Sequence, residues 1–210
     1  MIKVLVADDH PVVREGLRRI LSENRDFNLV AEAKDGSEAV DLVGKTQPDV
    51  VLLDLTMPGP GFLEVLERLK AARSNTKVLV MSAHAEDQYA LRVLKAGAAG
   101  YLSKDHTPQE LVGAVRQVVK SGRYVSPKLA DQFAAEMTGE RSGSTHSKLS
   151  NREYQILCLI GAGKSVKEIA GQTSLSPKTV STYRTRLMEK LKLKTTADVI
   201  RYAVENGLVT

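Results

Sequence analysis

Three aspartates, a serine and a lysine occupy positions where the side chains of a parallel α/β sheet would meet. Asp8 and Asp9 follow one short apolar run, Asp54 follows another, and Ser82 and Lys104 follow two more. Ligands of such sheets bind beyond the carboxyl ends of the strands, so we expect these side chains to share one rim. Carboxylates held close together repel, and a hard divalent cation with oxygen ligands, most simply Mg²⁺, compensates them. The lysine and hydroxyl facing that cation predict a trianionic guest such as a phosphoryl group.

A second candidate set lies on a helical pattern that begins at Ser176-Pro177, a cap followed by proline, and runs to about Leu191. At roughly 100° per residue, one face is apolar and the opposite face is polar. The polar face carries Lys178, Thr182, Thr185, Arg186 and Glu189, with Ser181 on its flank. A polar face is also typical of any solvated surface helix. The shorter helical pattern over 166–172 favours a helix-turn-helix, whose second helix enters a major groove.

The distribution of charge supports a polyanionic partner for the second set. Residues 1–120 hold 16 basic and 17 acidic side chains, whereas residues 121–210 hold 14 and 8. The whole surplus of the chain, +5, therefore lies in the C-terminal part, as expected of a region that meets nucleic acid.

Composition excludes several other classes of protein. Hydrophobic residues make up 42% and charged residues 26%, which is ordinary globular usage. The single cysteine, Cys158, excludes an internal disulfide, and the four histidines lack metal-ligand spacing to one another. No apolar run approaches the ~18–20 residues of a membrane span, and the run Met1–Ala7 reaches Asp8 too soon for a signal peptide. We expect a soluble cytoplasmic protein without membrane contact.

Short apolar runs alternate with helical patterns up to about residue 121. The expected strands are Ile2–Ala7, Leu29–Ala33, Val50–Leu53, Val78–Met81 and Ala98–Leu102, and the expected helices are Pro11–Glu23, Gly36–Lys45, Leu63–Ala71, Asp87–Lys95 and Pro108–Lys120. This alternation predicts a five-stranded, doubly wound parallel sheet of the flavodoxin-like class.

Beyond Gly122 the strand pattern disappears. A short helix is expected from Ser126-Pro127 to about Met137, followed by a small, polar, flexible linker over 138–146. Helical patterns over 151–161, 166–172, 177–191 and 196–206 then predict an all-α four-helix unit. We expect a first domain at 1–121, a linker at 122–147 and a helix-turn-helix domain at 148–210.

The acidic set resembles the receiver domain of two-component response regulators. The matching text is Asp8-Asp9, Asp54-Leu55-Thr56-Met57-Pro58-Gly59, Ser82-Ala83 and Tyr101-Leu102-Ser103-Lys104. The stretch Pro58–Phe62 departs from the family pattern, because the acidic residue and glycine usual before the third helix are missing.

This resemblance implies a role for each matched position. Asp54 would accept a phosphoryl group from a sensor histidine kinase. Mg²⁺ would be bound directly by Asp9, through water by Asp8, and by Asp54 and the Thr56 carbonyl. After transfer, Ser82 and Lys104 would bind the phosphoryl oxygens. Tyr101 would move as part of the conformational switch.

The helical unit resembles the LuxR-type DNA-binding domain of the NarL/LuxR regulators. The matching text is Leu149-Ser-Asn-Arg-Glu153, Gly163-Lys-Ser, Lys167-Glu-Ile-Ala170, Ser176-Pro-Lys-Thr-Val180 and Lys190-Leu191, while Val166 and Tyr183 depart from the family pattern. The resemblance implies that base edges face Ser181, Thr182 and Thr185. Phosphates would be held by Lys178, Thr179, Arg186 and Lys190.

The last helix leaves two alternatives open. Thr195-Thr-Ala-Asp198 resembles a capping box that opens it. In the family this helix commonly pairs two DNA-binding domains, which would make Val199, Tyr202 and Ala203 dimerisation residues. The same residues would equally serve to pack inward.

Two further patterns resemble motifs of other protein classes, and each lacks a required residue. Gly161–Ser165 resembles the end of a P-loop, but Cys158 stands where the motif needs glycine and the segment follows a helix. Val50–Thr56 resembles phosphatases with an aspartate nucleophile, yet Thr56 replaces their second aspartate.

We therefore expect a transcription regulator controlled by phosphorylation, with a histidine kinase, double-stranded DNA and a second copy of itself as partners, and not an enzyme. Two rivals remain: an aspartate-nucleophile phosphohydrolase, and a DNA-binding protein whose receiver is a passive dimerisation module.

Overall fold

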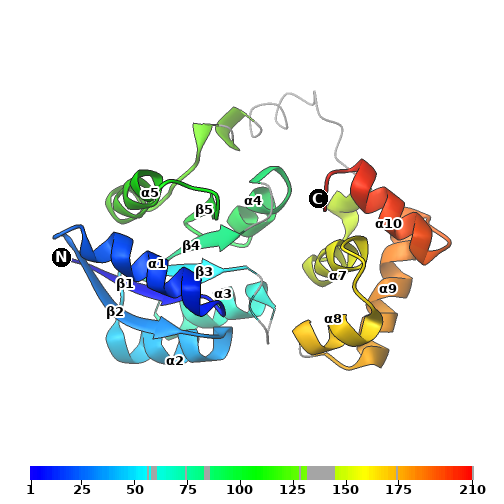
Figure 1. Ribbon diagram of the computed structural model, residues 1–210, viewed down its shortest axis with the longest axis horizontal. Coiled ribbons are helices and arrows are strands. Elements are labelled where there is room, and N and C mark those ends of the chain that lie inside the picture. Colours follow the sequence, from blue (N-terminus) through cyan, green and yellow to red (C-terminus); the bar gives the residue numbers. More distant parts are fainter. Residues whose placement is uncertain are drawn as a thin grey trace. The chain divides into compact units, whose positions relative to one another are not determined.

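The computed structural model describes residues 1–55, 57, 61–73, 75–82, 86–127, 129–131, 145–173 and 175–209, apart from a few side chains. The chain divides into two compact units, residues 1–130 and residues 131–210 (Figure 1). Thr56, one of the expected metal ligands, lies outside the described residues.

The first unit is a five-stranded parallel sheet with helices on both faces, as expected. Its strands lie in the order β2-β1-β3-β4-β5, so the sequence order reverses between β1 and β3. Helices α1 and α5 cover one face, and α2 and α3 cover the other (Figure 1). The strands are β1 (Ile2–Ala7), β2 (Phe27–Ala33), β3 (Val50–Asp54), β4 (Lys77–Ser82) and β5 (Gly100–Ser103). The helices are α1 (Pro11–Ser22), α2 (Gly36–Thr46), α3 (Phe62–Ala72), α4 (Glu86–Lys95) and α5 (Pro108–Ser121).

The core of this unit explains why its central strands are continuous apolar runs. In β3 the four residues before Asp54 are each at most 1% exposed, because helices cover both faces of the strand. Strand β2 begins at Phe27, two residues before the expected start, because the Phe27 ring is buried in the core cluster beneath α1 and α5.

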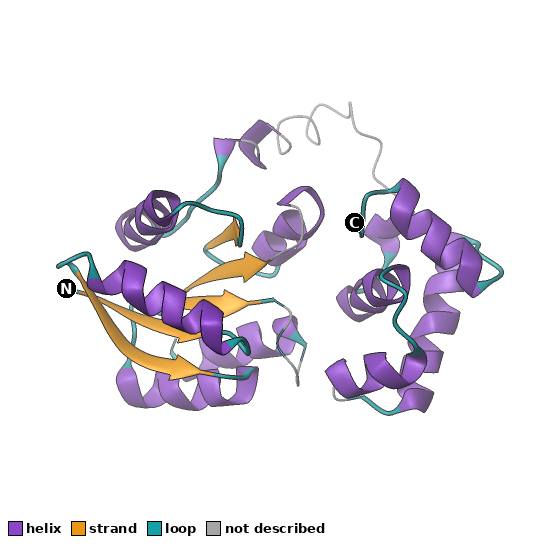
Figure 2. Ribbon diagram, in the orientation of Figure 1, coloured by secondary structure: helices purple, strands orange, loops and turns teal. Residues whose placement is uncertain are grey.

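Where the structure describes the second unit, its regular elements are all helices (Figure 2). They are the 3₁₀ helix η1 (Thr145–Lys148), α7 (Asn151–Gly161), α8 (Val166–Thr173), α9 (Pro177–Leu191) and α10 (Thr196–Glu205). Capping boxes open α7 at Ser150 and α10 at Thr195, and the Ser176 side chain caps α9. The expected box at the start of α10 is thereby confirmed.

Gly161 ends α7 at the crossing with α10. It is the last residue of α7, and a Cβ built on it would lie 2.4 Å from the Cβ of Ala203 in α10. Only glycine therefore permits the two helices to approach this closely. The turn itself is made at Gly163, whose φ of +76° favours glycine.

The expected helix after Ser126 is visible at its beginning, where the amide of Leu129 donates to the Ser126 hydroxyl at 3.1 Å. Its remainder and most of the expected linker fall in 132–144, outside the described residues. Among the helices of the described residues, none has the length and apolarity that a membrane span requires.

Candidate functional site

An acidic pocket lies at the carboxyl ends of β1 and β3. Asp8 directly follows β1 and Asp54 ends β3, and they are 2% and 3% exposed. The ammonium of Lys104 lies 2.7 Å from Asp8 Oδ2 and 3.1 Å from Asp54 Oδ2. Lys104 follows β5, and its amide donates to the carbonyl of Ser82 at 2.7 Å. The structure thus brings together residues that are up to 96 positions apart in the sequence.

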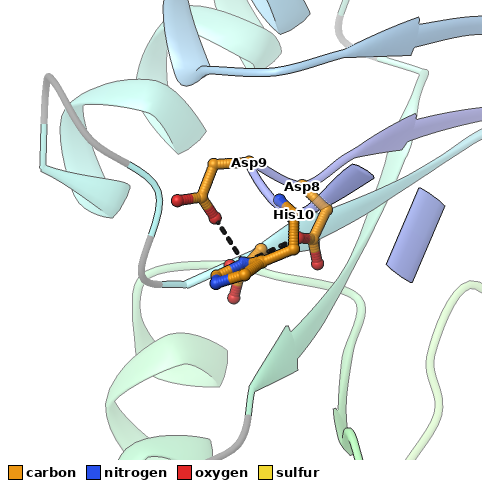
Figure 3. A group of neighbouring side chains, drawn as sticks. Asp8, Asp9 and His10 are labelled. Carbon is orange, nitrogen blue, oxygen red and sulfur yellow. Dashed lines mark hydrogen bonds and ion pairs between the residues drawn. The ribbon is translucent and has the colours of Figure 1, made fainter. Parts of the chain in front are cut away.

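Asp9 and His10 complete the pocket (Figure 3). His10 Nδ1 lies 2.8 Å from Asp9 Oδ1 and 3.3 Å from Asp8 Oδ1, and the His10 amide donates to Asp8 Oδ1 at 2.8 Å. One potential ligand atom from each of Asp8, Asp9, His10 and Asp54 lies within 4.8 Å of the others. His10 was not expected at this site, because none of the other histidines stands at metal-ligand spacing from it; its place directly after Asp8 and Asp9 is the signal that points to it.

The charges of the pocket and one buried oxygen of Asp9 fit a hard divalent cation. Three carboxylates face the single ammonium of Lys104, which leaves two negative charges for a divalent cation to balance. Asp9 Oδ1 is buried and accepts no well-aligned hydrogen bond from the part of the chain that the structure describes. Carboxylate oxygens are the ligands that Mg²⁺ prefers, so Asp8, Asp9 and Asp54 suit this ion.

Lys104 is held in its charged form. Burial lowers its pKa, but the hydrogen bond to Asp8 and the charge of Asp54 outweigh burial, so the pKa lies above the ordinary lysine value. At neutral pH the pocket therefore contains a permanently charged ammonium. Its flexible side chain can reach a new negative group nearby.

Ser82 and Tyr101 occupy neighbouring positions on the last two strands. Ser82 ends β4, pairs with Ser103 of β5 and is fully buried. Tyr101 pairs with Val80 and is also fully buried, so its ring lies in the interior of the receiver unit.

The polar face of α9 in the helical unit is as expected. Val180, Leu187 and Leu191 are buried, whereas the exposed residues include Lys178, Thr182, Thr185, Arg186 and Glu189. Three hydroxyls on this helix donate to carbonyls four residues earlier: Ser181 to Pro177, Thr182 to Lys178 and Thr185 to Ser181. These hydroxyls present their lone pairs outward and behave as acceptors toward a partner.

Two of the expected phosphate contacts are engaged within the domain. Lys190 Nζ lies 2.7 Å from Glu153 Oε2 in α7, and the Thr179 hydroxyl lies 2.8 Å from that of the capping Ser176. Burial raises the pKa of Glu153, but its hydrogen bonds with Lys190 and Ser150 lower it more. Lys178 and Arg186 are exposed, and neither side chain has a comparable contact within the part of the chain that the structure describes.

Of the two alternatives for α10, the structure shows inward packing for Val199 and Ala203. Both are fully buried, because α10 packs against α7 and Ala203 abuts Gly161. Tyr202 is half-buried, and its hydroxyl lies 3.1 Å from His146 Nδ1 in η1. Val204, on the same helix, is the large apolar residue left outside, at 59% exposure.

Comparison with known proteins gives the same two-part division. The model of the response regulator receiver domain matches residues 4–116, and that of bacterial regulatory proteins of the luxR family matches residues 147–203. The response regulator UvrY of Escherichia coli K12 is 40% identical over 209 residues, covering 99% of this chain and 96% of UvrY. The response regulator GacA of Pseudomonas aeruginosa is 40% identical over 210 residues, covering 100% and 98%.

A solved structure extends this likeness to both units. RcsB from Salmonella enterica serovar Typhimurium, bound to promoter P1flhDC in the presence of phosphomimetic BeF3-, has a TM-score of 0.70 and 26% identity. The match covers 96% of this chain and 97% of RcsB.

A flavodoxin-like sheet with a buried aspartate cluster, followed by a helix-turn-helix unit, defines a signal receiver joined to a DNA-binding domain. The chain belongs to the response regulators with a LuxR-type DNA-binding domain. It is thus a phosphorylation-dependent, DNA-binding transcription regulator, as the sequence predicted. This family consists of transcription regulators rather than of enzymes with a turnover reaction.

Proposed function

We propose that Asp54 is the phosphoacceptor of this regulator and that a sensor histidine kinase is the donor. The observation that carries the proposal is the contact of Lys104 with both Asp8 and Asp54, at 2.7 and 3.1 Å. It places a permanent cation beside the one carboxylate that ends the central strand β3. A phosphoryl group formed on Asp54 would therefore lie within reach of the Lys104 ammonium.

Transfer consists of one bond formed and one bond broken. A carboxylate oxygen of Asp54 attacks the phosphorus of a phosphohistidine, the P–N bond breaks, and the histidine nitrogen leaves with the electron pair and takes a proton. Mg²⁺, held by Asp8, Asp9, Asp54 and the Thr56 carbonyl, would neutralise charge on the transferring oxygens. Position 56 is threonine, so the acyl phosphate has no carboxylate there to activate water. The phosphoryl group is stored rather than turned over.

The stored phosphoryl group adds charge beside Lys104 and Ser82. We infer that the ammonium leaves Asp8 for the phosphoryl oxygens and that the Ser82 hydroxyl donates to them. Because Lys104 directly follows β5, this movement would bias the strand that carries Tyr101. The receiver then has two packings, one for each charge state of Asp54.

The helical unit would bind double-stranded DNA through the exposed face of α9. Lys178 and Arg186 suit phosphates, and Ser181, Thr182 and Thr185 suit base edges. Thr179 and Lys190 would contact phosphates only after giving up their present partners, Ser176 and Glu153. We propose that the protein acts in the cytoplasm and binds as a homodimer, with the exposed part of α10 near Tyr202 and Val204 as the contact.

Phosphorylation by a small phosphodonor with Mg²⁺ tests the proposal. Wild type and an Asp49→Asn control should be labelled, and Asp54→Asn should not. Asp49 is a sound control because it precedes β3, at the other end of the strand, and accepts from the amide of Lys3 at 2.8 Å. Stoichiometric labelling of a folded Asp54→Asn protein would contradict the assignment. Steady release of phosphate with many turnovers would instead favour the phosphohydrolase alternative.

A further inference from the structure

We propose that Arg14 is a positioning residue for the cation site, through the backbone between Asp8 and Asp9. This inference rests on the Mg²⁺ site of the proposed function. Arg14 lies in the second turn of α1, six residues after Asp8, and Nη1 donates to the Asp8 carbonyl oxygen at 2.7 Å. The structure records no contact between the Arg14 guanidinium and the side-chain carboxylates of the cation site. Arg14 would therefore act on that site only through the main chain.

The hydrogen bond to the Asp8 carbonyl restrains the backbone of both Asp8 and Asp9. The carbonyl of Asp8 and the amide of Asp9 belong to one planar peptide unit. Fixing that carbonyl therefore fixes the plane from which both aspartates depart. The other side of Asp8 is held as well, because its amide donates to the carbonyl of Ala33 in β2 at 3.1 Å. Arg14 supplies the second of the two anchors, on the side that faces Asp9.

Glu32 orients the arginine. It lies in β2 opposite Val6 of β1, and its Oε2 is 3.4 Å from Arg14 Nε. The side chains of Arg14 and Glu32 are 19% and 23% exposed, so the pair is shielded from much of the solvent. The other oxygen of Glu32, Oε1, accepts from Arg18 Nε and Nη2 at 2.8 and 2.6 Å. Glu32 thus has two arginine partners, and only one of them contacts the cation site.

This asymmetry provides a matched control within the same network. Arg18 shares the partner Glu32 and the same helix, but its recorded contacts are with Glu32 and Glu15. If the network served only to attach β2 to α1, losing either arginine would have the same kind of effect. If Arg14 orients the aspartates, only its loss weakens the cation site. Outer partners of metal ligands commonly change metal affinity by about 10–100-fold.

Mg²⁺ affinity of the full chain, measured by calorimetric titration without phosphodonor, tests the inference. Arg14→Gln should weaken Mg²⁺ binding by roughly tenfold, the low end for such partners, and Arg18→Gln should remain within about twofold of wild type. Arg14→Lys keeps the charge but not the planar fork that reaches two partners. Its Mg²⁺ affinity should therefore lie between those of Arg14→Gln and wild type. In phosphorylation assays the Mg²⁺ concentration for half-maximal rate should rise, while the rate at saturating Mg²⁺ changes little.

The outcomes separate the two proposals. A folded Arg14→Gln protein with the Mg²⁺ affinity of wild type would overturn the role of Arg14. If Arg14→Gln does not fold, Arg14→Lys and Glu32→Gln decide: weaker Mg²⁺ binding in either supports the inference, and wild-type affinity in both overturns it. Failure of the wild type itself to bind Mg²⁺ would contradict the proposed cation site instead, together with the inference that depends on it.

Discussion

The ammonium of Lys190 lies 2.7 Å from the buried carboxylate of Glu153, so the end of α9 is tied to the first turn of α7. Glu153 also accepts from the amide of Ser150, which makes it both half of a capping box and half of an ion pair. Helix α9 therefore takes part of its orientation from Glu153 of α7, which lies outside the helix-turn-helix. The end of α9 is accordingly less free to contact phosphate than Lys178, which lies exposed in its first turn.

Replacing Glu153 by glutamine should destabilise the helical unit. The amide keeps an oxygen for Ser150 but loses the charge that pairs with Lys190. We expect the free energy of unfolding to fall by about 1 kcal/mol, since Lys190 is partly exposed and water screens the pair. Amide hydrogen exchange in α7 and α9 of the full chain measures this change.

The dependence on pH provides a control for this prediction. Although burial raises the pKa of Glu153, its hydrogen bonds hold it below the ordinary value. The stabilisation is therefore complete above the unfolded pKa, about 4.3, and is lost as the pH falls through the lower folded pKa. The difference between wild type and Glu153→Gln should shrink in that range. Glu168→Gln, at an exposed cap of α8 near Ser165, should have a smaller effect at pH 7; an equal effect would contradict the role of Lys190.

Replacing Lys104 by methionine should destabilise the receiver unit in the absence of divalent cations. Asp8 and Asp54 would then lack the cation that contacts them both, and the loss should be on the order of 3 kcal/mol, as for a broken buried ion pair. Added Mg²⁺ should narrow the gap in Tm between variant and wild type. Without the ammonium the pocket has more uncompensated negative charge and should bind Mg²⁺ more tightly, so the ion should stabilise the folded variant more than the folded wild type. Thermal unfolding across a Mg²⁺ series measures this, and a gap independent of Mg²⁺ would contradict it.

The same lysine predicts a pH dependence of the wild type. Burial lowers the pKa of Lys104, yet its contacts with Asp8 and Asp54 raise it above the ordinary value. Its stabilisation is therefore fully present below the unfolded pKa, about 10.4, and is lost only as the pH rises through the higher folded value. Lys104→Met should lack this alkaline loss.

A fragment that begins at residue 145 should be more stable than one that begins at 148. The shorter fragment lacks His146, whose ring contacts Tyr202 at 3.1 Å and packs near Tyr154. We expect a loss of about 1 kcal/mol, or roughly 4–8 °C in the Tm of a small domain. Both fragments should bind DNA without phosphodonor. His146→Ala in the longer fragment should reproduce the loss, and equal stability of the two fragments would place the boundary at 148, as the sequence suggested.

Lys178→Ala and Thr182→Ala should impair DNA binding in different ways. Lys178 is exposed in the first turn of α9, so its loss should weaken binding to all sequences and lower the slope of log K against log salt by about one per site. Thr182 is uncharged, and its hydroxyl donates to the Lys178 carbonyl at 3.0 Å. As an acceptor it suits the amino group of adenine or cytosine.

Thr182→Ala should therefore keep the salt slope and relax discrimination at one base pair by roughly 1 kcal/mol, the low end for a base contact. Titrations at several salt concentrations, on a specific and a scrambled site, separate the two variants. Equal weakening of both sites with a lower slope for Thr182→Ala would contradict the placement of α9 in the groove.

The sequence predicted the fold well because each element carries its own local signal. The apolar run before Asp54 identifies β3, and the Ser-Pro pair at 176 opens α9 where expected. Parallel strands place their carboxyl ends at one edge of the sheet, so the convergence of Asp8, Asp54 and Lys104 at one rim was also predictable.

The contacts that the sequence did not reveal depend on side-chain direction in the folded chain. Arg14 carries no motif, and only the crossing of α1 over β1 brings it to the Asp8 carbonyl. The pair of Glu153 and Lys190 spans 37 residues and two helices. Periodicity alone does not decide whether Val199 and Ala203 pack inward or face a second copy, because a small domain has few faces that are wholly exposed.

The close approach of Gly161 to Ala203 couples two positions on different helices. A Cβ at 161 would also lie 3.1 Å from Cγ1 of Val209, so this end of α7 is enclosed by two neighbours rather than one. A larger residue at either 161 or 203 would force α10 away from α7 and strain the site of Tyr202 and His146. Substitutions at 161 and 203 are therefore non-additive, and an α10 grafted from another regulator will fit this scaffold only if it brings an equally small side chain to that crossing.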